Sequence, residues 1–227
     1  MISFTRPRSE LQAQVTKVDT AQVEIKQAFQ GQRIPTLVAT SMLCYNAPMP
    51  ARVDPIIASF ASTIQPNSRI IDIGAGKGLV AKEMTRLFGA RVTLVDVAQY
   101  NNTDLPLTVC DSRALAFADD SFDYALLSFV LHHSPNPDRI LLEALRVARE
   151  VFVVENDVRG KLRSAVTRLI DSWPAIRYGT PPCYFTRTRE EWKDWFARFP
   201  VDAIDLKEFA LEYGFYRNLT VLLRKHD

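Results

Sequence analysis

Carboxylates and glycines gather where short apolar runs end in the middle of the chain. Asp72 lies in the first of these runs, and Gly74, Ala75 and Gly76 follow it. Glycines at such a turn permit positive φ angles and let a ligand approach the backbone without meeting a Cβ atom. Asp96 ends the next run, twenty residues after Gly76. Its carboxylate suits the two hydroxyls of a ribose.

A third acidic position follows the next apolar run, residues 107–109. Asp111 and Ser112 stand there, and their oxygens could accept a hydrogen bond from an adenine amino group. Val97, directly after the second strand-end carboxylate, completes this part of the expected binding set. In an open parallel sheet, ligands bind at the carboxyl ends of the strands, so residues that end strands are the informative ones.

The glycine turn does not have the spacing of a dinucleotide site. Position 79 is Leu and the third glycine falls at Gly78, whereas the dinucleotide fingerprint is GxGxxG. A pyrophosphate needs that spacing because it opens helix N–H groups to the anion. A ligand with an adenosine and an amino-acid tail needs mainly a close backbone and a polar rim. Alone, the turn also fits an ordinary βα connection; with the three carboxylates it predicts a nucleoside ligand.

Polar side chains also follow the fourth and fifth apolar runs. His132 and His133 come after residues 122–128, at the rim where a second substrate would arrive. Either could act as a general base or orient that substrate, or could simply bond nearby backbone. Glu155 and Asn156 follow the fifth run and are expected substrate contacts, with solvated loop polarity as the alternative.

Alternating apolar runs and helical patterns predict the elements that hold these residues. Uninterrupted apolar runs are typical of parallel strands buried on both faces. Such strands are expected at residues 69–73, 92–95, 107–109, 122–128 and 151–154. Helices are expected through Leu79, Met84 and Leu87 with an end at Gly89, and over 137–148. Right-handed helical crossovers leave few arrangements other than a doubly wound parallel sheet.

Two further strand-like runs close the chain. Residues 201–209 and 215–224 are joined by a short connection, so they must pair antiparallel. The expected fold class is therefore α/β, a seven-stranded doubly wound sheet that is mostly parallel and has an antiparallel C-terminal hairpin. Residues 1–65 are expected to form a helical cap. Its three expected helices cover residues 11–29, begin at Pro35, and include Ile56 to Phe60. Residues 66–227 are expected to form the main domain, with an insertion at about 158–199.

Composition agrees with a soluble folded protein. The chain has 227 residues, of which 47% are hydrophobic and 24% charged, so disorder, collagen and coiled coil are excluded. The 28 basic and 26 acidic side chains give a net charge of +2. A global nucleic-acid footprint is absent, and no DNA partner is expected.

The three cysteines, Cys44, Cys110 and Cys183, show no CxxC pair and no neighbouring histidine. Neither a disulfide scaffold nor a metal site is predicted from that spacing. The N-terminus has no apolar segment behind its basic residues, and no apolar stretch is long enough to span a membrane. We expect a cytoplasmic protein.

Residues 158–189 form a basic segment, with seven Lys and Arg side chains against the single acid Asp171. Interleaved aromatics such as Tyr184 could make it a lid over an anionic, aromatic or lipid-like substrate, or a surface that binds RNA or an anionic membrane. A solvated face over an ordinary core is an equal alternative. Tyr45, ahead of the sheet, could also cover a ligand or pack in the core.

Three stretches resemble class I S-adenosylmethionine-dependent methyltransferases, particularly the branch with the ubiquinone and menaquinone biosynthesis methyltransferases. They are IIDIGAGKG at 70–78, LVDV at 94–97 and CDSRALAFADDSFDYALLSFVLHH at 110–133. The resemblance covers about residues 65–155 and implies a Rossmann-like fold with S-adenosylmethionine as cofactor. It further implies contacts of Gly74 and Gly76 with the aminoacyl end, Asp96 with the ribose, Asp111 and Ser112 with the adenine, and Ser128 with the methionine side.

The activity implied is methyl transfer to an oxygen, nitrogen or carbon of a small organic acceptor, by a monomer or homodimer. Two alternatives stay open: a methyltransferase acting on RNA or protein, and a catalytically silent protein that binds the cofactor. Many members of the family have a PGG turn before the fifth strand, where this chain has Ala148, Arg149 and Glu150. That departure and the unmatched insertion leave the acceptor unidentified.

Overall fold

The computed structural model of the chain describes residues 50–178, 180–211 and 216–226. The helices expected over 11–29 and from Pro35 lie outside these residues, as do Cys44 and Tyr45. The third expected N-terminal helix is confirmed as α3 (Pro50–Phe60). Its apolar stripe, which includes Ile56, Ile57 and Phe60, is buried.

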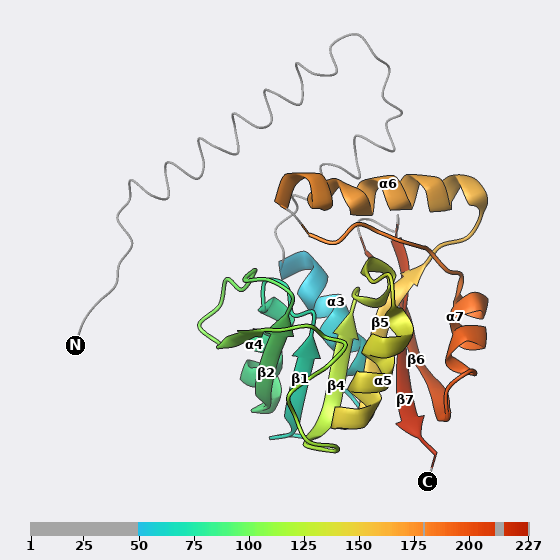
Figure 1. Ribbon diagram of the computed structural model, residues 1–227. Coiled ribbons are helices and arrows are strands. Elements are labelled where there is room, and N and C mark those ends of the chain that lie inside the picture. Colours follow the sequence, from blue (N-terminus) through green and yellow to red (C-terminus); the bar gives the residue numbers. More distant parts are fainter. Residues whose placement is uncertain (1–49, 179, 212–215, 227) are drawn as a thin grey trace, which may run out of the picture. The chain divides into compact units, whose positions relative to one another are not determined.

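Seven strands within the described residues form one sheet, in the order β3-β2-β1-β4-β5-β7-β6 (Figure 1). The strands are β1 (Arg69–Ile73), β2 (Arg91–Asp96), β3 (Leu107–Val109), β4 (Phe122–Ser128), β5 (Ala148–Asp157), β6 (Val201–Leu211) and β7 (Tyr216–Lys225). Strands β1 to β5 pair parallel, whereas β7 pairs antiparallel with β5 and β6. The predicted α/β fold is confirmed. The strand order reverses at β1, which lies between β2 and β4.

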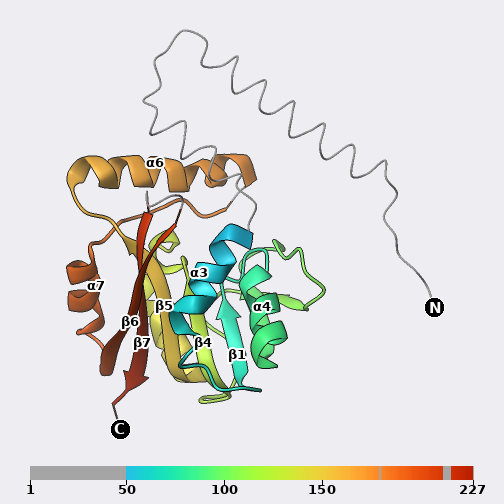
Figure 2. The ribbon, with the colours of Figure 1, turned by 180° about the vertical axis from the view of Figure 1, so that it is seen from behind.

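Helices cover both faces of the sheet (Figures 1 and 2). On one face, α3 and α4 (Leu79–Phe88) pack through Phe60 and Met84 against Ile70, Leu126 and Phe152. On the other face, α5 (Pro137–Val147) and α7 (Arg189–Phe196) belong to a second group of buried apolar residues, which includes Leu141, Phe196, Ile71 and Val153. Burial on both faces is why β1 and β4 read as continuous apolar runs.

The expected insertion contains two helices, α6 (Lys161–Tyr178) and α7. Helix α6 crosses the end of the sheet toward which the parallel strands point (Figures 1 and 2). Helix α6 therefore covers the edge of the sheet at which a ligand would bind. None of the described helices has the length and apolar character needed to cross a membrane.

The boundary between α5 and β5 differs from the expectation. Helix α5 ends at Val147, and Ala148, expected in the helix, has extended backbone (φ −125°, ψ 153°) and begins β5. No loop separates the two elements, which explains the missing PGG turn. Strand β5 also runs on to Asp157 because its polar end pairs with β7; apolar periodicity alone could not show this extension.

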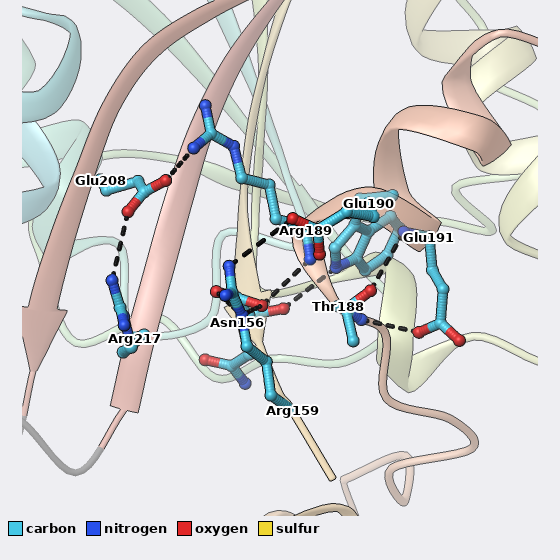
Figure 3. Close-up of polar contacts among 10 residues, drawn as sticks. Asn156, Arg159, Thr188, Arg189, Glu190, Glu191, Glu208 and Arg217 are labelled. Atoms are coloured by element: carbon cyan, nitrogen blue, oxygen red, sulfur yellow. Dashed lines mark hydrogen bonds and ion pairs between the residues drawn. The ribbon is translucent and has the colours of Figure 1, made fainter.

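Polar contacts fix the N-terminus of α7 to the end of β5 (Figure 3). The Thr188 hydroxyl accepts the Glu191 N–H at 3.1 Å, and the Glu191 carboxylate accepts the Thr188 N–H at 2.7 Å, which completes a capping box. Asp157, the last residue of β5, accepts the Arg189 N–H at 3.0 Å. The Arg189 side chain forms an ion pair with Glu208 on β6. The segment that leads into α7 is therefore anchored to the sheet.

Candidate active site

A cavity of about 920 Å³ opens at the carboxyl ends of β1, β2 and β4, where the strand order reverses. This is the place where open α/β sheets bind ligands. Its lining brings together every residue that the sequence analysis assigned to cofactor binding, namely Asp72, Gly74, Ala75, Gly76, Asp96, Val97, Asp111, Ser112 and Ser128.

The glycine turn folds under the end of β2. The backbone N–H groups of Gly74 and Ala75 both donate to the Val95 carbonyl, at 2.8 and 3.1 Å. Gly74 has a φ of 74°, and a Cβ there would lie 2.5 Å from Val130 Cγ2. A Cβ at Gly76 would meet no atom within 4 Å, so open space borders its backbone. A ligand can approach this stretch closely.

Asp96 joins the glycine turn to the end of β2. Its Oδ2 accepts the Gly76 N–H at 2.8 Å, and its Oδ1 accepts the Val97 N–H at 2.7 Å. Burial raises the pKa of Asp96, and these backbone hydrogen bonds oppose that rise. A carboxylate offers about four acceptor sites, so Asp96 keeps acceptor capacity for a hydroxyl donor beside the backbone N–H groups that it already binds. The side chain can thus shape the turn and still bind a ribose.

Asp72 is a second buried carboxylate at this edge. Burial, together with the nearby charge of Asp96, raises the pKa of Asp72 to about 7. A cationic group in the cavity would favour the ionised form of Asp72 and lower that pKa. The pair of acidic side chains therefore makes this part of the cavity receptive to a ligand that carries positive charge.

Asp111 and Ser112 line the outer part of the cavity in different ways. The Asp111 side chain is exposed and paired with Arg113 at 2.6 Å, which lowers the pKa of Asp111 to about 2. Ser112 is buried. Of the two expected adenine contacts, Ser112 is the one enclosed by the protein.

The residues fit S-adenosylmethionine. Uncovered backbone at Gly76, buried carboxylates at two adjoining strand ends and a buried hydroxyl at Ser112 match the aminoacyl, sulfonium, ribose and adenine groups of that molecule. The match lies in the chemistry of the donor set, which offers acceptors to hydroxyl and ammonium groups and an open approach to the backbone.

Beyond Ser128, the turn η1 (Leu131–His133) brings two histidines to the cavity wall. Glu155 Oε2 lies 2.5 Å from Nδ1 of the buried His132 ring, and Glu155 Oε1 accepts the Leu131 N–H at 2.9 Å. Burial alone would lower the pKa of His132, but the charge and hydrogen bond of Glu155 raise it above its ordinary value. Glu155 therefore holds this ring in one orientation.

His133 differs from its neighbour in charge. Burial, followed by the charge of His132, lowers the pKa of His133 to about 4, so its ring is neutral near neutral pH. The two ring centroids are 4.2 Å apart. Both histidines line the cavity, as expected for groups that meet a second substrate.

The expected substrate contacts divide into three groups. Asn156 and Tyr184 line the cavity, and Tyr45 lies outside the described residues. Glu155 is 0% exposed and lies behind His132, with both oxygens engaged. Glu155 is not among the residues that line the cavity, so its place fits the positioning of His132 better than direct substrate contact, and that expected contact stays a prediction.

Two side chains near His132 were missed as site residues. Asp171 on α6 lines the cavity, and Cys183 follows that helix in the chain. One ligating atom from each of His132, Asp171 and Cys183 lies within 4.8 Å of the others. Burial, followed by the charges of Asp171 and Glu155, raises the pKa of Cys183 to about 12. The one available signal was that Asp171 is the single acid in a basic segment.

Known proteins match the part of the chain that carries most of the residues of this site. The family described as Methyltransferase domain matches residues 71–151. A demethylmenaquinone methyltransferase of Renibacterium salmoninarum is 29% identical over 173 residues, which cover 68% of this chain and 70% of that protein. A ubiquinone/menaquinone biosynthesis C-methyltransferase of Rickettsia massiliae is 33% identical over 101 residues, 37% of this chain and 41% of that protein.

Solved structures share the fold. A Burkholderia thailandensis 1,6-didemethyltoxoflavin-N1-methyltransferase, with its substrate and S-adenosylhomocysteine bound, aligns with a TM-score of 0.57 and 16% identity over 100% of this chain and 93% of its own. A methyltransferase from Methanosarcina mazei aligns with a TM-score of 0.53 and 23% identity over 75% of this chain and 97% of its own. Together, these matches and the shared fold support a class I S-adenosylmethionine-dependent methyltransferase, of the kind that includes the ubiquinone and menaquinone biosynthesis C-methyltransferases.

Proposed function

We propose that the protein methylates a small organic acceptor with an apolar, aromatic body and an oxygen-bearing edge. One observation carries the proposal: a single cavity is lined both by the glycine turn with its carboxylates and by the group around His132 and Asn156. Cofactor and acceptor can therefore meet in one cavity. The relatives named above act on quinone precursors, according to their names, and a quinol has this chemistry.

The acceptor part of the cavity combines apolar walls with a few polar groups. Helix α3, the residues after β4 and helix α5 supply the apolar walls, through Val53, Ile56, Phe129, Val130 and Ile140. Polar groups among them include His132, Asn156 and Asp171. Such a lining suits a flat ring whose polar edge must be oriented, because apolar surface supplies affinity and a few polar atoms supply direction.

When bound, the cofactor supplies a methyl group on a positively charged sulfur. The chain itself binds and aligns the two substrates and excludes water beneath α6. Alignment of this kind can contribute on the order of 7–11 kcal/mol to lowering the barrier. Because Glu155 fixes the His132 ring, that ring can orient a hydroxyl on the acceptor.

The basic segment gives less support to an RNA or membrane acceptor than its composition suggests. Arg187 lies over the rings of Phe185, Trp192 and Trp195, at 4.2, 4.7 and 4.8 Å. Arg159 pairs with Asp157 and Arg189 with Glu208. These three cations have partners inside the protein and are not arranged as a free basic surface. Oligomeric state and a cytoplasmic location stay predictions.

Calorimetry and a methylation assay on the full chain test the proposal. We expect S-adenosylhomocysteine to bind, and we expect methyl transfer from S-adenosylmethionine to a naphthohydroquinone with an open ring position. The product should gain the mass of one methyl group. Transfer RNA and cell protein serve as competing acceptors. Absence of S-adenosylhomocysteine binding, or methyl incorporation into RNA or protein alone, would overturn the proposed function.

A further inference from the structure

Four side chains from distant parts of the sequence meet beside the acceptor part of the cavity. His132 comes from η1, Glu155 from β5, Asp171 from α6, and Cys183 from the segment that leads to α7. His132 and Cys183 are each 4% exposed, and Glu155 is 0% exposed. Imidazole, carboxylate and thiol at one buried point form a donor set that transition-metal ions bind.

The separations suit ligands that share an ion. His132 Nε2 and Asp171 Oδ2 are 3.9 Å apart, which is too long for a direct hydrogen bond. Tetrahedral zinc holds its N, O and S ligands at about 2.0–2.3 Å, so two ligand atoms on it lie roughly 3.3–3.8 Å apart. The measured distance is close to that value. One atom from each of His132, Asp171 and Cys183 falls within 4.8 Å of the others, so small shifts would complete the site.

Glu155 prepares His132 for this role. The carboxylate engages Nδ1 of the ring, which leaves Nε2 as the nitrogen that faces Asp171. Metal-binding histidines commonly give their other ring N–H to a carboxylate, which fixes the tautomer and the ring orientation. Glu155 is itself held by the Leu131 N–H. The histidine is thus oriented from behind by a buried acceptor.

Hydrogen bonds between neighbouring residues tie the three ligands together. The Cys183 N–H donates to Ser172 Oγ at 3.1 Å, so Cys183 is fixed to the residue after Asp171. The Tyr184 N–H donates to the His132 carbonyl at 2.9 Å, so the same segment is also fixed to η1. The geometry is therefore built by contacts that do not involve the ligating atoms.

Charge also favours a cation here. Two carboxylates, Glu155 and Asp171, lie within contact distance of one imidazole ring. Binding requires that Cys183 and any protonated His132 Nε2 release their protons to solvent. A divalent ion would then offset two of the three negative charges of Glu155, Asp171 and the Cys183 thiolate. Binding would break the contact of the Cys183 thiol with the Phe185 carbonyl, now 3.2 Å long. That weak hydrogen bond is replaced by a metal–sulfur bond.

We propose that His132 Nε2, an Asp171 carboxylate oxygen and Cys183 Sγ bind a zinc-class divalent ion, with Glu155 positioning His132. Three protein ligands leave a fourth position for water or substrate. His132 and Asp171 line the cavity, so that position would face the acceptor. If the proposed function holds, the ion held by His132, rather than a free nitrogen of the His132 ring, would bind the oxygen-bearing edge of the acceptor. Ion binding itself does not depend on the proposed function.

Cobalt provides the first test, because thiolate-bound Co²⁺ has an intense charge-transfer band in the near ultraviolet. The full chain is stripped of metal with a chelator, dialysed and titrated with Co²⁺, and Zn²⁺ is then added as competitor. We expect one Co²⁺ per chain, a thiolate band and its loss on Zn²⁺ addition. Cys183→Ser should abolish the band, while Cys110→Ser, the matched control, should keep it. A band absent from the wild type, or retained in Cys183→Ser, would overturn the proposal.

Two further measurements test the metal site without the Cys183→Ser variant, in case that variant fails to fold. Glu155→Gln should weaken Co²⁺ binding by about 10- to 100-fold while the band persists, the effect typical of losing the partner of a metal-binding histidine. Zinc-edge X-ray absorption of the wild-type protein should show one sulfur at about 2.3 Å and N or O atoms at about 2.0–2.1 Å. A shell of oxygen and nitrogen alone would contradict the site.

Calorimetry with S-adenosylhomocysteine separates this proposal from the proposed function. Cofactor-product binding without a cobalt band would overturn the metal site alone. A cobalt band without S-adenosylhomocysteine binding would support the metal site and overturn the proposed function.

Discussion

Gly76 donates its backbone N–H to the Asp96 carboxylate across a gap of twenty residues in the sequence, at 2.8 Å. The other Asp96 oxygen accepts the Val97 N–H at 2.7 Å. One side chain at the end of β2 therefore holds the turn that follows β1. The same carboxylate lines the cavity and keeps acceptor capacity for a ligand, so turn geometry and ligand recognition depend on one residue.

Asp96→Asn should therefore weaken cofactor binding. In asparagine only the amide oxygen accepts hydrogen bonds. Either the Gly76 N–H or the Val97 N–H would therefore face the NH₂ group and lose its acceptor. Hydrogen bonds to charged groups contribute about 1.5–3 kcal/mol, which corresponds to roughly 10- to 100-fold in Kd. Calorimetry with S-adenosylhomocysteine measures the change. Asp104→Asn is the matched control, because Asp104 is exposed and pairs with Lys82 on the surface; equal affinities of wild type and Asp96→Asn would contradict the assignment.

Two glycines of the turn should respond differently to the same substitution. Gly76→Ala adds a methyl group where no atom lies within 4 Å, at a φ of 53°. The protein should fold with a loss of about 1–2 kcal/mol from the left-handed backbone. Because Gly76 lines the cavity, S-adenosylhomocysteine binding should weaken by about tenfold or more. Urea denaturation and calorimetry on the same sample separate the two effects.

Gly74→Ala should instead damage the fold. The new Cβ would lie 2.5 Å from Val130 Cγ2, and overpacking of this kind typically costs about 1–3 kcal/mol beyond the backbone strain. Adding Val130→Ala should restore that part of the loss and leave only the strain at φ 74°. Unfolding free energies from urea denaturation test the pair. No recovery in the double variant would mean that the clash with Val130 is not the cause.

The sheet could be predicted because its strands are buried on both faces. Residues 69–73 and 122–128 have apolar residues at most of their inner positions, and both are strands within the expected bounds. The polar end of β5, Glu155 to Asp157, could not be predicted as strand. Those residues pair with β7, where Glu155 lies opposite Leu219, and a pairing across so long a stretch leaves no periodic signal in either segment.

The candidate site, like the sheet, has one part that could be predicted from the sequence and one part that could not. Residues at the ends of parallel strands share one edge of the sheet, so topology alone brings Asp72, Asp96 and Ser112 to one cavity. Asp171 reaches the cavity, and Cys183 reaches Asp171 and His132, only because α6 crosses that edge (Figure 1). The direction of a helix that follows a strand depends on tertiary packing, and no spacing rule relates positions 132, 171 and 183.

Arg146→Ala should destabilise the protein and loosen the loop that carries Asp111 and Ser112. Its guanidinium donates to the carbonyls of Leu115 and Phe117, at 2.9 and 2.8 Å, and pairs with Glu143. Loss of these bonds should cost on the order of 2–3 kcal/mol. Urea denaturation of wild type and Arg146→Ala measures this loss in the free energy of unfolding.

The helix α4 pair provides the control for that experiment. Arg86 and Glu83 are also three residues apart on a helix, but the Arg86 side chain is 65% exposed. Arg86→Ala should change the free energy of unfolding by about 0.5 kcal/mol or less. Similar losses for Arg86→Ala and Arg146→Ala would show that the carbonyl contacts of Arg146 add nothing.

Asp72 should make stability fall as pH rises. Its pKa is about 7 in the folded protein, raised by burial and then by Asp96, against about 3.9 when unfolded. Between these values the folded state binds more protons, so its stability decreases with rising pH and levels off above about pH 7. The loss is at most about 4 kcal/mol. Asp72→Asn should remove this slope and should be more stable than wild type at about pH 8.

Cofactor binding should favour the ionised form of Asp72, whereas burial favours the protonated form. A positively charged ligand stabilises ionised Asp72, so near neutral pH its binding should release protons to the buffer. Calorimetry of S-adenosylmethionine in two buffers of different ionisation enthalpy should give different apparent heats for wild type and a smaller difference for Asp72→Asn. The variant should also bind more weakly at about pH 8, where the wild-type carboxylate is charged. Equal heats in both buffers, with unchanged affinity in the variant, would show that Asp72 does not sense the bound cation.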